Sequence, residues 1–242
     1  MFYFFHRKKK IVLDCFTSNT NAFEYTPVIR GSKAFPDWWK KLPTSKVEDD
    51  NFNMLKFLNL KKCYGFNELF KRSIILQNWT DLKIKVTPNN GYSFQLTNGK
   101  LPEGHIERQY EGGFVDYYNI KLMSPWFFRE KTGVHFMFVA AEWNLEKYDF
   151  KILPGCVEYR VNHGTNVNIM LPKKQSDYYL YLPLSLPLVH MIPMVDDAKI
   201  VIKNHLVTDE EIKKYASPPT TFEGINKLIN IKNKQSKCPF HF

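Results

Sequence analysis

Cysteine is scarce in this sequence, and its few cysteines are widely spaced. Four are present, Cys15, Cys63, Cys156 and Cys238, and no two of them form a Cys-x-x-Cys pair. Structural zinc sites need thiolate or imidazole ligands at short spacing, and disulfide frameworks belong to secreted proteins. The pattern therefore argues against both, and it favours free thiols in a reducing compartment.

The short motifs of common catalytic and cofactor sites are also missing. The chain holds no phosphate-binding P-loop, no glycine-rich dinucleotide fingerprint and no nucleophile elbow. Cys238 and His241 form the one cysteine–histidine pair within a few residues, and no further ligand lies near them in the sequence. We therefore expect no metal site and no cofactor, and the sequence favours a protein without catalytic activity.

A hydrophobic run long enough to span a bilayer is likewise absent. The first ten residues, MFYFFHRKKK, are too short for this, because a spanning helix needs about 20 apolar residues. Their apolar residues precede the charges, which is the reverse of the order in a secretory signal. We therefore expect neither export nor a membrane anchor.

What the sequence does have is apolar and aromatic content suited to β-sheets. Its 242 residues are 44% hydrophobic, with 20 phenylalanines and 13 tyrosines, and such residues pack well on pleated surfaces. We predict a mainly β fold, an antiparallel sandwich or partly open barrel with a few short peripheral helices. Residues 1–206 are expected to form one β-rich domain, and residues 207–242 a helical C-terminal extension with a basic tail.

The densest run of strand and turn signals covers residues 152–195. It alternates strands and turns, with strands predicted at 166–171, 178–182 and 186–194. Elsewhere, strands are predicted at 11–16, 25–29, 73–76, 82–86, 92–97, 134–139 and 196–202, and a hairpin-like link at 127–133. Helices are predicted near 36–42, 63–72 and 208–231.

The formal net charge of +10 is concentrated at the two ends, in residues 7–10 and 227–237. Basic ends can contact phosphates weakly and without specificity, or they can touch an acidic partner. A solvated lysine-rich surface is the other interpretation, and no arginine–aromatic interleaving or nucleic-acid motif decides between them.

Trp38 and Trp39 lie side by side in the first predicted helix. Neighbouring residues cannot face the same way on a helix, so we expect one of them in the core and the other exposed. One interpretation is that the two rings clamp the helix onto the sheet, and the other is that the exposed ring makes this pair a candidate surface for a protein partner.

Two segments carry a resemblance to a known superfamily, Gly155-Cys-Val-Glu-Tyr-Arg160 and Leu186-Pro-Leu-Val-His-Met-Ile-Pro193. The first is similar to the Gly-hydrophobic-hydrophobic-Asp segment with a following Tyr-Arg of the dUTPases and dCTP deaminases, and the second to a later strand of the same superfamily. The resemblance implies a β-clip core, a trimer and Mg²⁺-dependent nucleotide chemistry. Glu158 would take the place of the water-positioning aspartate, and Arg129, Lys131 and Arg160 would bind the anionic ligand.

A second resemblance extends over nearly the whole chain. The segments that carry it are 35–43, 62–66, 75–82, 124–126, 153–155 and 187–193, and they are similar to a conserved protein family of marine tailed phages with myovirus-type genomes. It implies a viral origin and a place in the host cytoplasm or the virion. It implies no particular activity.

Two hypotheses therefore stand. The first is a non-enzymatic phage protein, a binding or virion-associated component with a protein partner or a second copy of itself. The second is a divergent nucleotide hydrolase or deaminase. A flat aromatic surface near Trp38 and Trp39 would favour the first, and a trimer with an acidic cluster around Glu158 the second.

Overall fold

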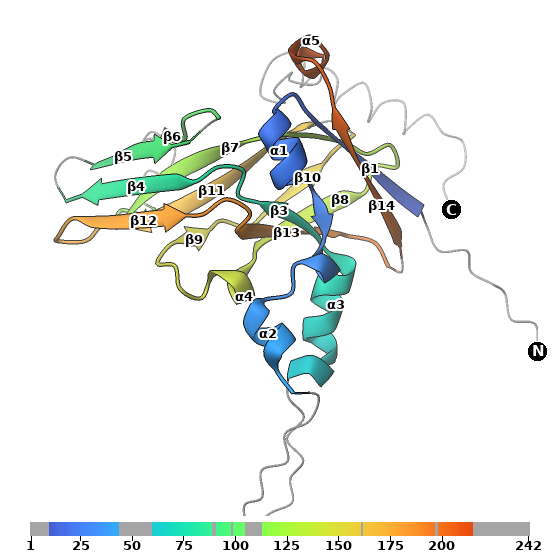
Figure 1. The fold of residues 1–242 in the computed structure, drawn as a ribbon, viewed down its shortest axis with the longest axis horizontal. Coiled ribbons are helices and arrows are strands. Elements are labelled where there is room, and N and C mark those ends of the chain that lie inside the picture. The colour runs from blue at the N-terminus through green and yellow to red at the C-terminus, as the bar shows by residue number, and fades with distance from the viewer. Residues whose placement is uncertain are drawn as a thin grey trace, which may run out of the picture.

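The computed structural model describes residues 10–43, 60–88, 91–97, 99–104, 113–160, 162–196 and 198–214. Within these residues the chain is mainly β, as predicted, and its strands form three sheets (Figure 1). The basic segments at 7–9 and 227–237 lie outside the described residues, as do His241 and Cys238.

The first sheet runs through the middle of the molecule. Its strand order is β14 (Lys199–Leu206), β1 (Lys10–Thr17), β7 (Tyr117–Arg129), β11 (Gly164–Pro172) and β9 (Lys151–Ile152), and β6 (Glu103–Gly104) pairs with β7. All of its pairs are antiparallel except β1 with β14, which are parallel from Lys10 opposite Lys199 to Thr17 opposite Leu206.

The other two sheets are wholly antiparallel. The second has the order β10 (Gly155–Glu158), β8 (His135–Ala140), β13 (Pro187–Pro193), β3 (Ile74–Gln77) and β2 (Ile29–Arg30). The third sheet has the order β12 (Tyr178–Leu182), β4 (Leu82–Thr87) and β5 (Gly91–Leu96), and it forms the left end of the view in Figure 1.

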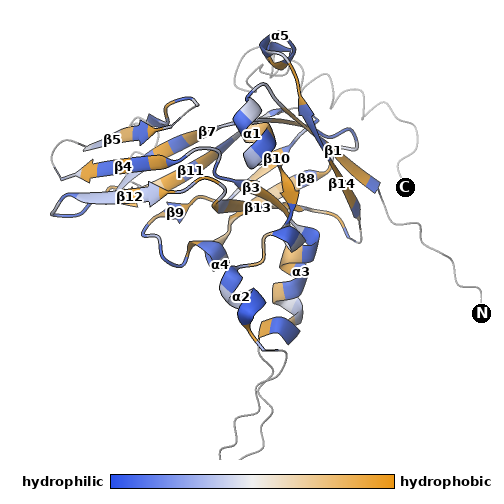
Figure 2. Cartoon of the chain, in the orientation of Figure 1, coloured by the Kyte–Doolittle hydropathy of each residue, from blue (hydrophilic) through white to orange (hydrophobic). Residues whose placement is uncertain are grey.

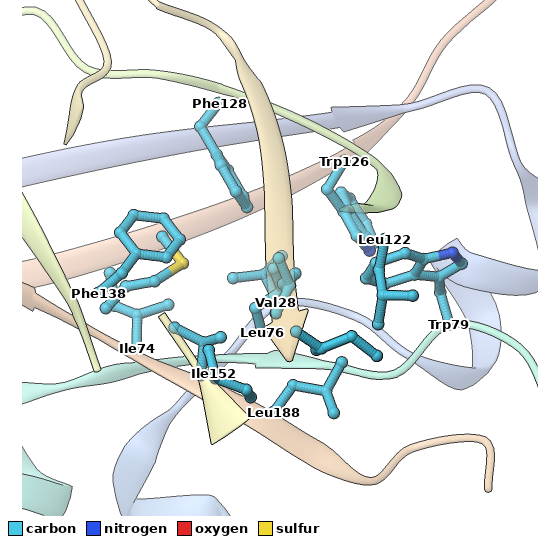
Figure 3. Packing of buried hydrophobic residues seen from close by; sticks show 14 of the residues in the cluster. Val28, Ile74, Leu76, Trp79, Leu122, Trp126, Phe128, Phe138, Ile152 and Leu188 are labelled. Carbon is cyan, nitrogen blue, oxygen red and sulfur yellow. The ribbon is translucent and has the colours of Figure 1, made fainter. Parts of the chain in front are cut away.

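One hydrophobic core joins the three sheets. The first sheet contributes Trp126 and Phe128, the second Phe138 and Leu188, and the third Leu82, all within one cluster of buried side chains. Figure 3 shows the first four of these residues together. Each fully buried side chain of this size contributes about 1.5 to 3 kcal/mol through apolar burial. The alternation of apolar and polar residues along the strands decides which side chains enter this core.

The stretch 152–195 holds the strands predicted for it, and it joins the architecture together. Its strands β11, β12 and β13 fall in the first, third and second sheet respectively. One continuous stretch therefore contributes to every sheet, which explains its density of strand and turn signals.

The helices lie at the margins of the sheets. They are α1 (Thr20–Tyr25), α2 (Asp37–Lys41), α3 (Tyr64–Arg72), α4 (Glu142–Leu145) and α5 (Asp209–Lys213), with short 3₁₀ turns η1 (Gly31–Lys33) and η2 (Leu60–Lys62). The helices predicted at 36–42 and 63–72 are confirmed. That predicted from 208 begins with a capping box of Thr208 and Glu211, and residues 215–242 lie outside the described part. None of the described helices is long and apolar enough to cross a membrane.

Two local predictions are wrong. The strand predicted at 25–29 begins only at Ile29, because Tyr25 is the last residue of α1. Asn19 caps the start of this helix by accepting a hydrogen bond from the Ala22 N–H at 2.9 Å. The link at 127–133 is no hairpin, because β7 and β8 belong to different sheets. The buried Glu130 carboxylate shapes this crossover by accepting hydrogen bonds from the backbone N–H groups of residues 132–134 at 2.7, 2.8 and 3.2 Å.

Candidate functional site

Glu158, the carboxylate that the hydrolase resemblance singles out, ends β10 at the edge of the second sheet. Its Oε1 accepts a hydrogen bond from Nε of Arg160 at 2.6 Å and forms an ion pair with Nη2 of the same side chain, also at 2.6 Å. Its Oε2 lies 3.8 Å from Nε2 of His135. The carboxylate is thus held by charge-assisted contacts on the protein itself.

The turn that carries Arg129 and Lys131 lies against this segment. The backbone N–H of Glu130 donates to the Tyr159 carbonyl at 3.4 Å, and a side-chain carbon at Gly133 would lie 2.9 Å from Cζ of Arg160. The fold therefore brings the neighbourhoods of the predicted anion ligands and Glu158 together. No group of three or more acidic, histidine or cysteine side chains able to hold a metal ion occurs in the described part of the chain.

Trp38 and Trp39 belong to an aromatic cluster formed by α2, α3, α4 and the segment just before α2. This cluster, the aromatic lobe, consists of Phe35, Trp38, Trp39, Phe66, Phe70 and Trp143.

Both tryptophans are half-buried, so the expected division into one core ring and one exposed ring is wrong. The reason is that both pack on Phe66, with ring centroids 6.1 Å away for Trp38 and 5.8 Å for Trp39. Trp39 also stacks on Phe35 at 4.0 Å. The Trp38 indole N–H donates to the Trp143 carbonyl at 3.2 Å, so the pair fastens α2 to its neighbours.

The third sheet presents a different surface. Along β4 the side chains of Leu82, Ile84 and Val86 are buried, while Lys83 and Lys85 point the other way, and Figure 2 shows this alternation of colour along β4. The same period of two places other side chains on the outer side of the sheet, and we call six of them the tyrosine–lysine face: Lys83, Lys85, Ser93, Gln95, Tyr179 and Tyr181.

The strand register arranges this face in two rows. Tyr179 of β12 lies opposite Lys85 of β4, which lies opposite Ser93 of β5. Tyr181 lies opposite Lys83, which in turn lies opposite Gln95. Across the sheet, each row therefore consists of an aromatic, a basic and a polar side chain.

The two tyrosines are exposed, with 60% of Tyr179 and 53% of Tyr181 accessible. Tyr179 lies beneath both lysines, since Nζ of Lys83 is 4.7 Å from its ring centroid and Nζ of Lys85 is 5.9 Å away. These are cation–π contacts, worth about 0.5 to 1 kcal/mol at exposed sites. The lysine charges are thus gathered on the aromatic surface.

Two aspartates border the face. The Asp81 carboxylate accepts hydrogen bonds from the Leu184 N–H at 2.9 Å and the Tyr181 hydroxyl at 2.7 Å, and these bonds lower the pKa of Asp81. Lys85 lies 3.2 Å from Asp177, whose hydrogen bond raises the pKa of the lysine. Asp81 therefore fixes the Tyr181 ring, and Asp177 partly neutralises Lys85.

Two further lysine–tyrosine contacts involve rings that pack against the hydrophobic core. Lys173 stands over Tyr118 and Lys174 over Tyr178, at 5.0 and 4.8 Å from the ring centroids. The Tyr178 hydroxyl donates to the Pro172 carbonyl at 2.7 Å, which joins the end of β11 to the start of β12. Burial, with smaller contributions from Asp149 and Tyr118, raises the pKa of Tyr178 to about 12, so this phenol stays protonated.

The sequence-based search missed the tyrosine–lysine face. The alternation in residues 82–86 and 178–182 shows that two lysines share one side of a strand, and two tyrosines one side of another. Only the register between β4 and β12 places the two pairs together. No protein-family model matches this chain, and no curated protein matches it.

Proposed function

We propose that this chain is a non-enzymatic binding protein whose tyrosine–lysine face binds a polyanionic partner. The observation that carries the proposal is the pairing of each exposed tyrosine with a lysine directly opposite on the neighbouring strand. Clustered lysines raise the local concentration of anions, and the formal net charge of +10 adds a long-range attraction of the same sign. Stacking surfaces beside those charges favour a partner that carries flat groups as well as anionic ones.

The sequence resemblance to the phage family supports a viral setting for this role. The protein would then act in the host cytoplasm or in the virion, as a binding or virion-associated component. A protein partner, including a second copy of this chain, would contact the aromatic lobe, where 40% of Trp143 and 78% of the neighbouring Tyr64 are accessible. Truncation of Trp143 to alanine should then weaken self-association, measured by light scattering. It should also reduce the amount of other phage proteins that co-purify with the chain.

The polyanion proposal is tested by retention on immobilised heparin. Replacing Lys83 and Lys85 together by glutamine should lower the salt concentration of elution, because two charges leave the face. The double variant Lys40→Gln with Lys71→Gln is the matched control, since it also removes two exposed lysines paired with acidic side chains, Asp37 at 2.8 Å and Glu68 at 3.4 Å, but on α2 and α3. Equal elution of the two double variants would refute the proposal.

The alternative proposal is a divergent nucleotide hydrolase or deaminase with a β-clip core. The proximity of His135, Glu158 and Arg160 to the basic turn at 129–131 is the observation in its favour. A thermal-shift screen against deoxynucleotides, with and without Mg²⁺, tests it. A nucleotide that binds only the folded protein, at a concentration of about a hundred times its dissociation constant, raises the free energy of unfolding by roughly 2.7 kcal/mol. The stabilisation should disappear in Glu158→Gln, and the absence of any shift in the unaltered protein would exclude this alternative.

A further inference from the structure

We infer that the polyanion bound by the tyrosine–lysine face is single-stranded nucleic acid, with bases stacked on Tyr179 and Tyr181 and phosphates over Lys83 and Lys85. The inference rests on the proposed function, because it names the ligand of the same surface. It assigns the tyrosines a role of their own, which a general attraction of charges does not require.

The side chains of the face form parallel columns along its three strands. Tyr179 and Tyr181 are two residues apart on β12, so their positions differ by about 7 Å along the strand. Each has its lysine opposite at a Cβ separation of about 5 Å. The rows thus form an aromatic column on β12, a basic column on β4 and a polar column of Ser93 and Gln95 on β5.

Each column fits a different part of a nucleotide. An aromatic ring offers a stacking partner to any base, a lysine ammonium neutralises a phosphate, and hydroxyl and amide groups hydrogen-bond to base edges or sugars. Sheet-based modules that bind single strands use aromatic side chains on the open face of a sheet in this manner. A nucleic acid that lies across all three columns satisfies each of them at once.

The shape of the face favours a single strand over a duplex. Bases in a duplex are stacked on each other, so their flat surfaces are not available to a protein ring. Duplex readers place a helix or a two-stranded ribbon into a groove. The tyrosine–lysine face is the broad side of a sheet, and its rings are reached only by unpaired bases.

The contacts already present on the face are ones that a nucleotide can replace. The exposed pair of Lys85 and Asp177 is of a kind that contributes little to stability. Lys83, which stands over Tyr179, can turn to a phosphate while a base takes its place on the ring. Tyr181 is held in place by its hydroxyl donating to Asp81, so less side-chain freedom is lost when a base stacks on it.

The test is fluorescence anisotropy with a labelled oligothymidine, using the full chain and a duplex of the same length as competitor. Tyr179→Leu and Tyr181→Leu should each weaken binding by about fivefold to a hundredfold, because one base stack is lost. Tyr179→Phe keeps the ring and should bind like the unaltered protein. Tyr64→Leu is the control, since it removes an even more exposed tyrosine from α3.

Salt titrations of binding distinguish the contribution of the basic column from that of the aromatic column. Lys83→Gln and Lys85→Gln should each reduce the slope of log affinity against log salt by about 0.7, the value for one phosphate on a single strand. The leucine variants should leave this slope unchanged. Thermal unfolding of each variant confirms that it is folded.

The outcomes distinguish this inference from the proposed function. If the lysine variants weaken binding but Tyr179→Leu and Tyr181→Leu behave like Tyr64→Leu, base stacking is refuted and a general polyanion site stands. Equal competition by duplex and single strand also refutes it. If neither the oligonucleotide nor heparin binds, both proposals fail.

Discussion

The buried His190 makes the stability of this protein depend on pH in a way that can be worked out from its surroundings. His190 lies in β13 with none of its side chain exposed. Its Nδ1 shares a hydrogen bond of 2.8 Å with the Ser73 hydroxyl, and Phe70 meets the ring edge-on at 4.9 Å. Its Nε2 has no hydrogen-bond partner among the described residues. Burial lowers the pKa of His190 from 6.5 to about 4.

The sign follows from which state takes up the proton. Above 6.5 the imidazole is neutral in both the folded and the unfolded chain. As the pH falls from 6.5 towards 4, the unfolded chain binds a proton that the folded chain cannot accommodate. The free energy of unfolding therefore decreases by up to about 1.4 kcal/mol per pH unit across this window, or about 3 kcal/mol in total. That is a large share of the usual stability of a domain.

Urea unfolding across this pH window measures the effect, and His190→Gln is the comparison. Carboxylates that titrate in the same range act equally on both proteins, so their contributions cancel in the difference. The unaltered protein should lose about 3 kcal/mol more than the variant as the pH is lowered through the window.

Equal losses in the two proteins would refute the reasoning, because they would mean that His190 titrates normally in the folded state. If His190→Gln does not fold, an NMR titration of the imidazole in the unaltered protein measures the same pKa directly. A ring that protonates near 6.5 while the protein remains folded contradicts the assignment of a buried neutral histidine.

Three further outcomes follow from single contacts. Asp177→Asn should tighten the binding of oligothymidine, because it frees Lys85 and removes a negative charge from the border of the face; weaker binding in the anisotropy assay would contradict this. Glu130→Ala should lower the free energy of unfolding by about 2 to 3 kcal/mol, since three backbone N–H groups lose a charged acceptor, and urea unfolding measures the loss. Gly31→Ala should lower the free energy of unfolding by about 1 to 3 kcal/mol in the same assay, because its Cβ would overlap the Ser73 hydroxyl and the Phe70 carbonyl. An unchanged urea midpoint would show that α3 moves aside freely.

Sequence periodicity was enough to predict most elements but not their assembly. The alternation of residues 82–86 and 166–171 identifies strands and their buried sides, and both are strands in the structure. Alternation carries no information about neighbours, so it could not assign β11, β12 and β13 to three different sheets. It also could not reveal that the chain crosses from β7 in the first sheet to β8 in the second, because the buried Glu130 that shapes the crossover resembles a surface residue in the sequence.

The same limit applies to the candidate sites. Glu158 and Arg160 are close in sequence, so their association follows from local strand geometry, whereas the partner of Lys83 across the sheet is Tyr181, far along the chain. Helical geometry suggested opposite directions for Trp38 and Trp39. Their real environment is set by Phe66, which lies on a different helix and is large enough to contact both rings.

The parallel pairing of β1 with β14 has a consequence for how the chain folds. Eight residue pairs join the first described strand to the last, so this edge of the first sheet closes only after nearly all of the intervening sequence has been synthesised. Contacts between such distant positions give the topology a high contact order. The chain between β1 and β14 loses conformational entropy when its ends come together, before the contacts between the two strands form. During synthesis, β1 therefore spends a long interval with one edge unpaired, the period in which nascent chains are most prone to associate with one another.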